Sequence, residues 1–253
     1  RKHVLLAIVT GREDTFRVEI SQCTWLSHVP KENVLVISDI VPSNVQTPHE
    51  WVAGKLPDGV EERDGDLFSP FVKKGYVRAV RSAGQGYSAA WIVAQFRFPQ
   101  ALAAMAERFE REPALRWAFL VDDDTMLSLD NLVRRLRAID AGDEAKRKAG
   151  AAPPPWYLSR KGWGGAGHGY SRTAMARVRA GLHECVDKWM VRQFRASDAM
   201  LLKCAGHLKL RAQLEGTMSH CPASHLREER MVDPGLATLH AKKDMYPPVL
   251  LAT

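Results

Sequence analysis

The sequence predicts an α/β fold with a mostly parallel sheet covered by helices on both faces. Three short apolar runs are continuous rather than alternating, which is typical of strands buried on both sides; they occupy residues 4–9, 33–39 and 117–121. Segments with apolar residues at helical spacing separate these runs, and this alternation favours a parallel sheet. With 253 residues, 45% hydrophobic and 26% charged, the chain is long and apolar enough to bury a core without staples.

The helices are predicted from apolar residues that share a face at intervals of three and four. The three faces are Phe16, Ile20 and Cys23; Phe98, Leu102, Met105 and Phe109; and Leu129, Leu132, Val133 and Leu136. Pro99 is expected near the start of the second helix, where proline is tolerated. Residues 41–75 are rich in Pro, Gly and acids and predict loop with short elements.

Residues 140–155 mix charged, small and proline residues, which predicts a mobile surface loop. The strand and helix pattern resumes after this segment, so a single domain over 1–253 is expected rather than two. In a sheet of this kind ligands bind at the carboxyl ends of the strands, near the point where strand order reverses.

The net charge of +7, from 36 Lys and Arg against 29 Asp and Glu, allows an anionic partner such as nucleic acid, an anionic membrane face or a nucleotide-linked substrate. The basic residues are scattered without interleaved aromatics, so no nucleic-acid partner is expected. No apolar run approaches the roughly 18 residues of a spanning helix. The sequence begins at Arg1, and we expect a preceding anchor or targeting segment.

Three adjacent carboxylates, Asp122, Asp123 and Asp124, follow the third apolar run directly. In an extended segment the first and third point the same way. Two such carboxylates at the end of a strand can hold a hard divalent ion, which neutralises a substrate diphosphate. The alternative is a solvated acidic turn that caps the helix beginning near Leu129.

A glycine-rich segment covers residues 162–169 and lets the backbone approach a ligand closely. It matches neither a dinucleotide fingerprint nor a phosphate loop. Ser171 is the predicted N-cap of the helix that follows, with Met175, Val178 and Leu182 on its inner face.

Ser197 and Asp198 precede a further helix with Leu201, Cys204 and Leu208 on one face. An acid at this place is favoured by capping alone. The same helix dipole keeps the Asp198 carboxylate ionised, so it can also serve as a general base. Of the later histidines, His220 and His225 lack a second ligand pair for zinc, and His240 taken alone reads as an edge-strand residue.

In combination, these segments resemble the fringe-like β-1,3-glycosyltransferases, which include the core-1 galactosyltransferases. The family's strand, DxD motif and following helix are similar to WAFLVDDDTMLSLDNLVRRL (117–136), and its GGxG segment is similar to GGAGHGYSRTAM (164–175). The stretch with its catalytic aspartate is similar to SDAMLLKCAGHL (197–208), and its last strand is similar to GLATLHAKK (235–243). AIVTGREDTFRVEISQCTWL (7–26) resembles the first strand and nucleotide loop more loosely.

The resemblance implies a GT-A-type, Rossmann-like fold and an inverting, Mn²⁺-dependent transfer from a UDP-sugar to a glycan or glycoprotein, in a β-1,3 linkage. It divides the chain into a nucleotide-binding half, 1–124, and an acceptor-binding half, 125–253. Asp198 would be the catalytic base. The implied metal ligands are Asp122, Asp124 and His240; the implied nucleotide-sugar contacts are Thr10, Gly11, Arg12, Asp39, Arg97, Asp123, Gly164 and Gly165.

The sequence departs from the family pattern at three places. The usual acidic pair before the last catalytic helix is Ser197-Asp198, so one carboxylate remains. The segment before the glycines, 159–163, is short. His220 lies about where the fringe subgroup has its metal ligand, which leaves it as an alternative to His240. Glu215 and Asp233 are the alternatives to Asp198 as base.

Relatives of this kind work in the Golgi lumen as type II membrane proteins, where disulfides persist. Cys23, Cys185, Cys204 and Cys221 form no CxxC pair, and on their own they allow up to two disulfides or four thiols. With the resemblance, Cys185 is expected to pair with Cys204, flanking the catalytic helix, and Cys23 with Cys221 remains as a second option.

Two other functions remain open at this point. A non-catalytic relative could act as a glycan-binding module or chaperone. A metal-dependent nucleotidyl or phosphoryl transferase could use the same acids, although it would want further carboxylates for a second metal. The donor sugar and the acceptor do not follow from the sequence.

Overall fold

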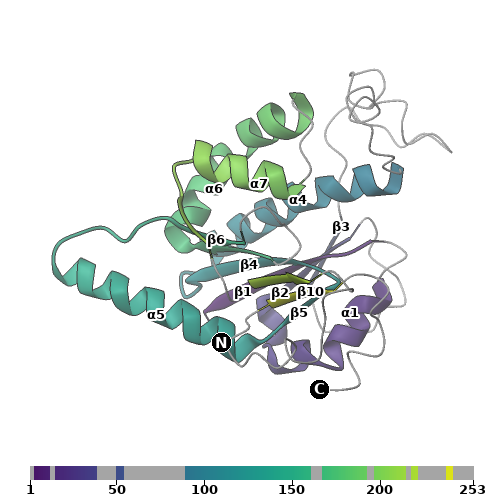
Figure 1. The fold of residues 1–253 in the computed structure, drawn as a ribbon, viewed down its shortest axis with the longest axis horizontal. Coiled ribbons are helices and arrows are strands. Elements are labelled where there is room, and N and C mark those ends of the chain that lie inside the picture. The colour runs from purple at the N-terminus through teal and green to yellow at the C-terminus, as the bar shows by residue number, and fades with distance from the viewer. Residues whose placement is uncertain are drawn as a thin grey trace.

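The computed structural model describes residues 3–11, 15–38, 50–53, 89–160, 167–192, 197–214, 218–221 and 238–241. Within these ranges seven strands form the central sheet, in the order β3-β2-β1-β4-β7-β6-β8 (Figure 1). Their bounds are β1 Val4–Val9, β2 Val34–Ser38, β3 Glu50–Ala53, β4 Trp117–Asp122, β6 Trp156–Ser159, β7 His168–Ser171 and β8 Arg211–Leu214.

The sheet is mostly parallel. β1 pairs in parallel with β2 and with β4, β2 with β3, and β6 with β8, whereas β7 runs antiparallel between β4 and β6. The chain leaves β1 toward β2 and β3 and returns to the other side of β1 as β4. Strand order therefore reverses between β1 and β4, and this is the place where α/β sheets bind ligands.

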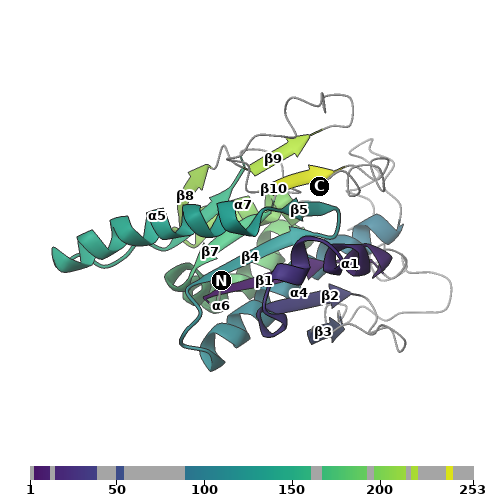
Figure 2. The same ribbon diagram turned by 90° about the horizontal axis from the view of Figure 1, so that it is seen from below.

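Helices cover both faces of the sheet, as the continuous apolar runs predicted. One face packs against α4 (Ala89–Arg111), α6 (Arg172–Cys185) and α7 (Ser197–His207), and the other against α1 (Thr15–Gln22), η1 (Trp25–His28) and α5 (Leu129–Lys148) (Figures 1 and 2). Alternate residues of β1 belong to the two cores: Leu5 and Ala7 to the first, Leu6 and Ile8 to the second. The predicted α/β fold class is confirmed.

A second, smaller sheet lies beside the carboxyl end of β4. Its order is β5-β10-β9 (Figure 2), with β5 at Thr125–Leu127, β9 at Met218–Cys221 and β10 at Thr238–Ala241. Leu127 and Met218 join the core under α5. β10 is the middle strand, so the interpretation of His240 as an edge-strand residue is wrong. Two short elements complete the described chain, η2 (Lys31–Asn33) and the π-helix η3 (Val186–Arg192).

Two helices differ from their predictions in detail. α1 forms, but it does not bury the predicted apolar face: Phe16 is 47% exposed, whereas Arg17 and Val18 are buried. The ionic contact of Arg17, described below, turns that side of the helix inward. In α4 the predicted face of Phe98, Leu102, Met105 and Phe109 is buried, but the helix begins at Ala89 and Pro99 lies inside it rather than near its start.

The loop predicted over 140–155 is wrong up to Lys148, because α5 continues to that residue. Ion pairs at helical spacing support this last part of α5: Lys146 Nζ lies 3.5 Å from Asp143 Oδ1, and Arg147 Nη2 lies 3.1 Å from Glu144 Oε2. Asp143 is buried and accepts a 2.7 Å hydrogen bond from Trp156 Nε1 on β6. Charged residues that predicted a loop therefore belong to a helix, and one of them, Asp143, bonds that helix to the sheet.

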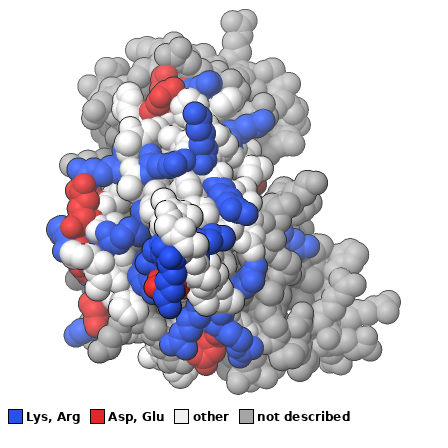
Figure 3. Space-filling view, turned by 90° about the vertical axis from the view of Figure 1, so that its left-hand side faces the viewer, with Lys and Arg blue, Asp and Glu red and all other residues white. Residues whose placement is uncertain are grey.

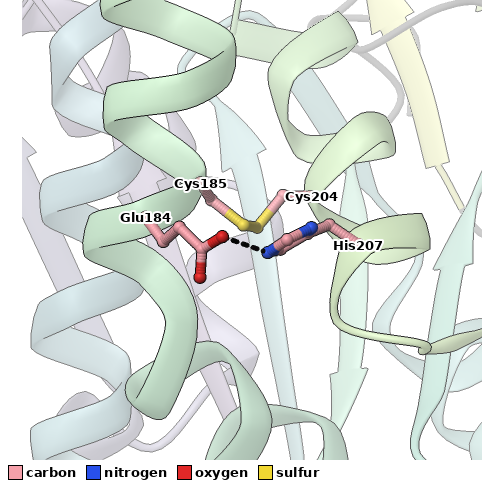
Figure 4. Close-up of a disulfide and its surroundings, with 4 residues drawn as sticks. All are labelled: Glu184, Cys185, Cys204 and His207. Atoms are coloured by element: carbon pink, nitrogen blue, oxygen red, sulfur yellow. Dashed lines mark ion pairs between the residues drawn. A yellow bond between two sulfur atoms is a disulfide. The ribbon is translucent and has the colours of Figure 1, made fainter.

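The predicted disulfide between Cys185 and Cys204 is confirmed (Figure 4). It joins the last residue of α6 to a residue inside α7, with 5.4 Å between the Cα atoms, so Cys204 does not flank the helix as expected. His207 Nε2 lies 3.0 Å from Glu184 Oε1 alongside it. Cys23 is an exposed free thiol, and the optional pairing with Cys221 is not formed.

The surplus of basic residues is visible on the face shown in Figure 3, where Lys and Arg outnumber Asp and Glu. Some arginines serve the fold rather than the solvent. Arg172 donates to three backbone carbonyls at the end of α4 and in the turn that leads to β4, those of Phe109, Glu112 and Leu115, at 2.9, 2.5 and 2.7 Å. None of the helices in the described ranges is both long enough and apolar enough to cross a bilayer.

The last glycines of the glycine-rich segment let β7 lie against the Phe119 ring of β4. Gly167 has φ +98°, and a Cβ there would lie 2.8 Å from Phe119 Cε1. A Cβ at Gly169 would lie 3.1 Å from the same ring and from Leu158 Cβ. For these two residues the close approach is to the protein's own core rather than to a ligand. Ser171 caps α6 as predicted, accepting from the Ala174 N–H at 3.3 Å.

We predict that Gly167→Ala destabilises the protein by about 1–3 kcal/mol, because a side chain at this positive φ is strained and meets Phe119. The matched control is Gly142→Ala in α5, where a Cβ meets nothing within 4 Å, and which should stabilise by about 0.5–1 kcal/mol. Urea unfolding measures both. Equal stabilities for the two variants would contradict the packing argument.

Candidate active site

The candidate site lies where β1 and β4 end side by side. Val9 and Asp122 are register partners. Beyond them, the Thr10 N–H donates to the Ile37 carbonyl at 2.9 Å and the Asp123 N–H donates to the Val9 carbonyl at 3.1 Å. These bonds extend the ladder past the strand ends, so residues that follow β1 and β4 are held at fixed positions on the carboxyl edge.

Asp123 is the buried anchor of this edge. Its Oδ2 accepts a 2.6 Å hydrogen bond from Thr10 Oγ1, and its Oδ1 accepts a 3.0 Å charged hydrogen bond from Arg17 Nη1. Burial raises the pKa of Asp123 to about 6, against the opposing effects of Thr10 and Arg17. Because both oxygens already serve Thr10 and Arg17, Asp123 is suited to hold the site together.

Arg17 was missed by the sequence analysis. It follows Phe16, which was predicted to face the core. An arginine next to such a residue in a helix is expected to be exposed to solvent. The one available signal was that Arg17, Val18 and Ser21 also share a helix face; all three are buried. A buried arginine needs a carboxylate partner, and Asp123 supplies it.

Asp122, at the end of β4, is the electrostatic centre of the site. Burial raises the pKa of its carboxyl well above the ordinary value, and the neighbouring charges of Asp124, Asp123 and Asp198 raise it further, whereas Arg97 lowers it. These electrostatic interactions link five predicted site residues from three separate segments: β4 and its end, α4 and α7. Several carboxylates thus act on one another, and two arginines oppose them: Arg97 at Asp122 and Arg17 at Asp123.

Asp198 lies in the first turn of α7, where its Oδ1 accepts a 2.7 Å hydrogen bond from the Ala199 N–H. The capping interpretation therefore fits the structure. The carboxylate is half-buried and interacts electrostatically with Asp122, as a base beside a donor-sugar site would. Its catalytic role stays a prediction.

The donor set suits a hard divalent cation. Carboxylate oxygens are the ligands that Mn²⁺ and Mg²⁺ prefer, and the mutual repulsion around Asp122 is what such an ion would relieve. Within the described ranges, no group of three or more His, Cys, Asp and Glu residues is placed to hold a metal. The ligand assignment stays a prediction.

The strand register distinguishes the two candidate histidines. His240 pairs directly with Thr125, the residue after Asp124, whereas His220 pairs with His240 and lies one strand farther away. Backbone placement therefore favours His240 over His220. Of the other predicted residues, Gly11 is buried beside Thr10. Arg12, Asp39, Gly164, Gly165, Glu215, His225 and Asp233 lie outside the described residues.

Comparisons with known proteins add little to this geometry. No protein-family profile and no curated protein sequence matches the chain. Among solved structures, the chain is similar to the apo form of mouse xyloside xylosyltransferase 1, with 8% sequence identity over 95% of this chain and 98% of that chain and a TM-score of 0.45. The function proposed below rests on the residues of the site.

We predict that Arg17→Met destabilises the protein by about 3–5 kcal/mol, because it leaves the buried Asp123 carboxylate without its cation. Adding Asp123→Asn should recover part of this loss. The control is Arg116→Met, whose ion pair with Asp140 at 3.3 Å is half-exposed and should cost no more than about 1 kcal/mol. Denaturant unfolding of the four proteins gives the values, and a similar cost for both arginines would show that burial of the pair is unimportant.

Proposed function

We propose that the chain is an inverting, metal-dependent glycosyltransferase that moves a hexose or N-acetylhexosamine from a UDP-sugar to a glycan or glycoprotein, in a β-1,3 linkage. One observation supports the proposal: the charges of Asp124, Asp198 and Arg97 act on the carboxyl of Asp122, which lies at the end of β4, where strand order reverses. Three of these residues come from two motifs that resemble the fringe-like family: Asp122 and Asp124 from residues 117–136, and Asp198 from residues 197–208.

The proposal gives each residue a role that its surroundings permit. Asp122 and Asp124, with His240, would hold the cation, which supplies Lewis-acid stabilisation of the departing UDP. Asp123 stays tied to Thr10 and Arg17 and keeps the edge in place beside the nucleoside. Arg97 adds a positive charge that suits the donor phosphates.

Asp198 would accept the proton of the acceptor hydroxyl as that oxygen attacks the anomeric carbon. A single displacement of this kind needs one base and inverts the anomeric centre. Because the leaving UDP is stabilised without protonation, no acid is required beside it. The half-buried position of Asp198, in the first turn of α7 and near Asp122, suits a base close to the donor sugar.

We also propose that the protein works in the lumen of the Golgi, where the type II enzymes that it resembles are anchored. The disulfide between Cys185 and Cys204 supports an oxidising compartment, because such bonds are rare in reducing ones.

UDP release, measured with and without Mn²⁺, separates this proposal from its alternatives. UDP-Gal, UDP-GlcNAc, UDP-GalNAc and UDP-Glc are screened as donors, with water or added glycans as acceptors. A glycosyltransferase releases UDP from at least one of them only with the metal. A glycan-binding module or chaperone releases none, and a nucleotidyl or phosphoryl transferase cleaves within the diphosphate and releases sugar 1-phosphate or UMP instead of UDP.

The metal role predicts that Asp124→Ala abolishes the Mn²⁺-dependent part of UDP binding while the fold stays intact. The physical reason is the loss of one of two carboxylates at the strand end. Glu144→Ala, an exposed acid on α5, is the matched control for the loss of one negative charge. Calorimetry that finds equal UDP affinity with and without Mn²⁺ in the parent protein would refute the metal site.

The base role predicts that Asp198→Asn lowers the rate of transfer by roughly 10²–10⁴-fold, the usual cost of removing a general base. UDP–Mn²⁺ affinity should change little, because the donor site lies on other residues. Asparagine still accepts the Ala199 N–H, so thermal stability should also stay close to that of the parent. A variant that transfers sugar within a few-fold of the parent rate would rule out Asp198 as the base.

A further inference from the structure

The first turn of α7 is held by one side chain of α4. Gln95 Oε1 accepts two hydrogen bonds from Ser197, one from its N–H and one from its Oγ, both at 2.8 Å. Gln95 is 7% exposed and Ser197 is 6% exposed. Two donors of one residue that converge on one buried oxygen restrict both the position and the rotation of that residue.

This contact lies next to the proposed base. Asp198 follows Ser197 directly, and its carboxylate accepts the Ala199 N–H in the same turn. The same helix, α4, carries Arg97, which acts electrostatically on Asp122. α4 and α7 pack on the same face of the sheet (Figure 1). α4 is therefore linked to both parts of the proposed site: Gln95 is hydrogen-bonded to the turn that carries Asp198, and Arg97 acts electrostatically on the proposed metal ligand Asp122.

The chemistry of Gln95 points to placement rather than to packing. A buried amide stabilises only through the hydrogen bonds that it makes, and an apolar side chain of similar size would fill the space equally well. The first N–H groups of a helix need external partners, but a water-exposed first turn would find them in solvent. A buried glutamine at this interface instead specifies a single position of the turn.

We propose that Gln95 is a positioning residue, which acts through Ser197 to hold the Asp198 carboxylate beside the donor site. The inference rests on the proposed function and adds a residue to it. Gln95 touches neither substrate nor metal in this scheme. Its loss should misplace the base, and a misplacement of about 1 Å can cost on the order of 10²-fold in rate.

The test compares Gln95→Met, which keeps the volume and removes the acceptor, with two changes of its partner. Ser197→Ala loses one of the two hydrogen bonds, and Ser197→Thr keeps both donors. We expect kcat for transfer to fall about 10- to 100-fold in Gln95→Met, less in Ser197→Ala, and to stay near the parent value in Ser197→Thr. The KM for the donor and the UDP–Mn²⁺ affinity should stay unchanged in all three.

A double-mutant cycle separates positioning from general damage. If Gln95 acts through Asp198, Gln95→Met lowers the rate no further in a protein that already carries Asp198→Asn. The control for lost stability is Asn33→Ala, which removes a buried hydrogen bond of 3.0 Å to the Val4 carbonyl at the opposite edge of the sheet. It should lower Tm to a similar extent and leave kcat unchanged.

Hydrogen exchange makes the result independent of the reaction assigned to the protein. Amides in the first turn of α7 should exchange faster in Gln95→Met than in Asn33→Ala. If the parent protein turns over no UDP-sugar, the proposed function is wrong. The exchange rates would still show whether Gln95 holds the turn that carries Asp198 in position. The inference is overturned if those rates are unchanged, if kcat stays within twofold of the parent, or if the losses from Gln95→Met and Asp198→Asn multiply.

Discussion

The buried contact of Asp123 with Thr10 and Arg17 is the interaction on which the site depends. It joins the ends of β1 and β4 and the first turns of α1 in one place. An ionised carboxylate is costly to bury, and this one is tolerated because both of its oxygens accept strong hydrogen bonds. With Asp123 held on both sides, the backbone at Asp122 is held as well, through its pairing with Val9.

That arrangement costs stability. Burial first, and then the repulsion of the neighbouring carboxylates, raises the pKa of Asp122, and this shift records the cost. A protein selected for stability alone would place amides or apolar residues there. A bound cation, as the proposed function requires, would offset this repulsion.

The sequence was sufficient where a pattern is local and insufficient where distant segments meet. The buried strands β1, β2 and β4 follow from continuous apolar runs, and the cap at Ser171 follows from its place before an amphipathic segment. The orientation of α1 could not be predicted, because it depends on the contact of Arg17 with Asp123, which lies 106 residues away in the chain. The segment with Asp143 and Lys146 predicted a loop, because both residues contact Trp156, which lies on β6 after the turn. Trp156 Nε1 donates to Asp143, and Lys146 Nζ lies 5.5 Å from the centre of the Trp156 ring. The contact of Gln95 with Ser197 spans 102 residues, and neither residue carries a local signal of it.

β10 has a consequence for how the protein is made. It inserts between β5 and β9 and lies in register with Thr125, beside the acidic residues after β4. The strands of the main sheet all precede it in the chain, so the ribosome synthesises the central layer before the strand that borders the acidic residues. Domains generally fold as units, and β10 supplies the strand that joins β5 to β9. A chain that ends before residue 238 therefore lacks the strand to which β5 and β9 are both bonded, so the small sheet beside the acidic residues is completed only when residues 238–241 are made.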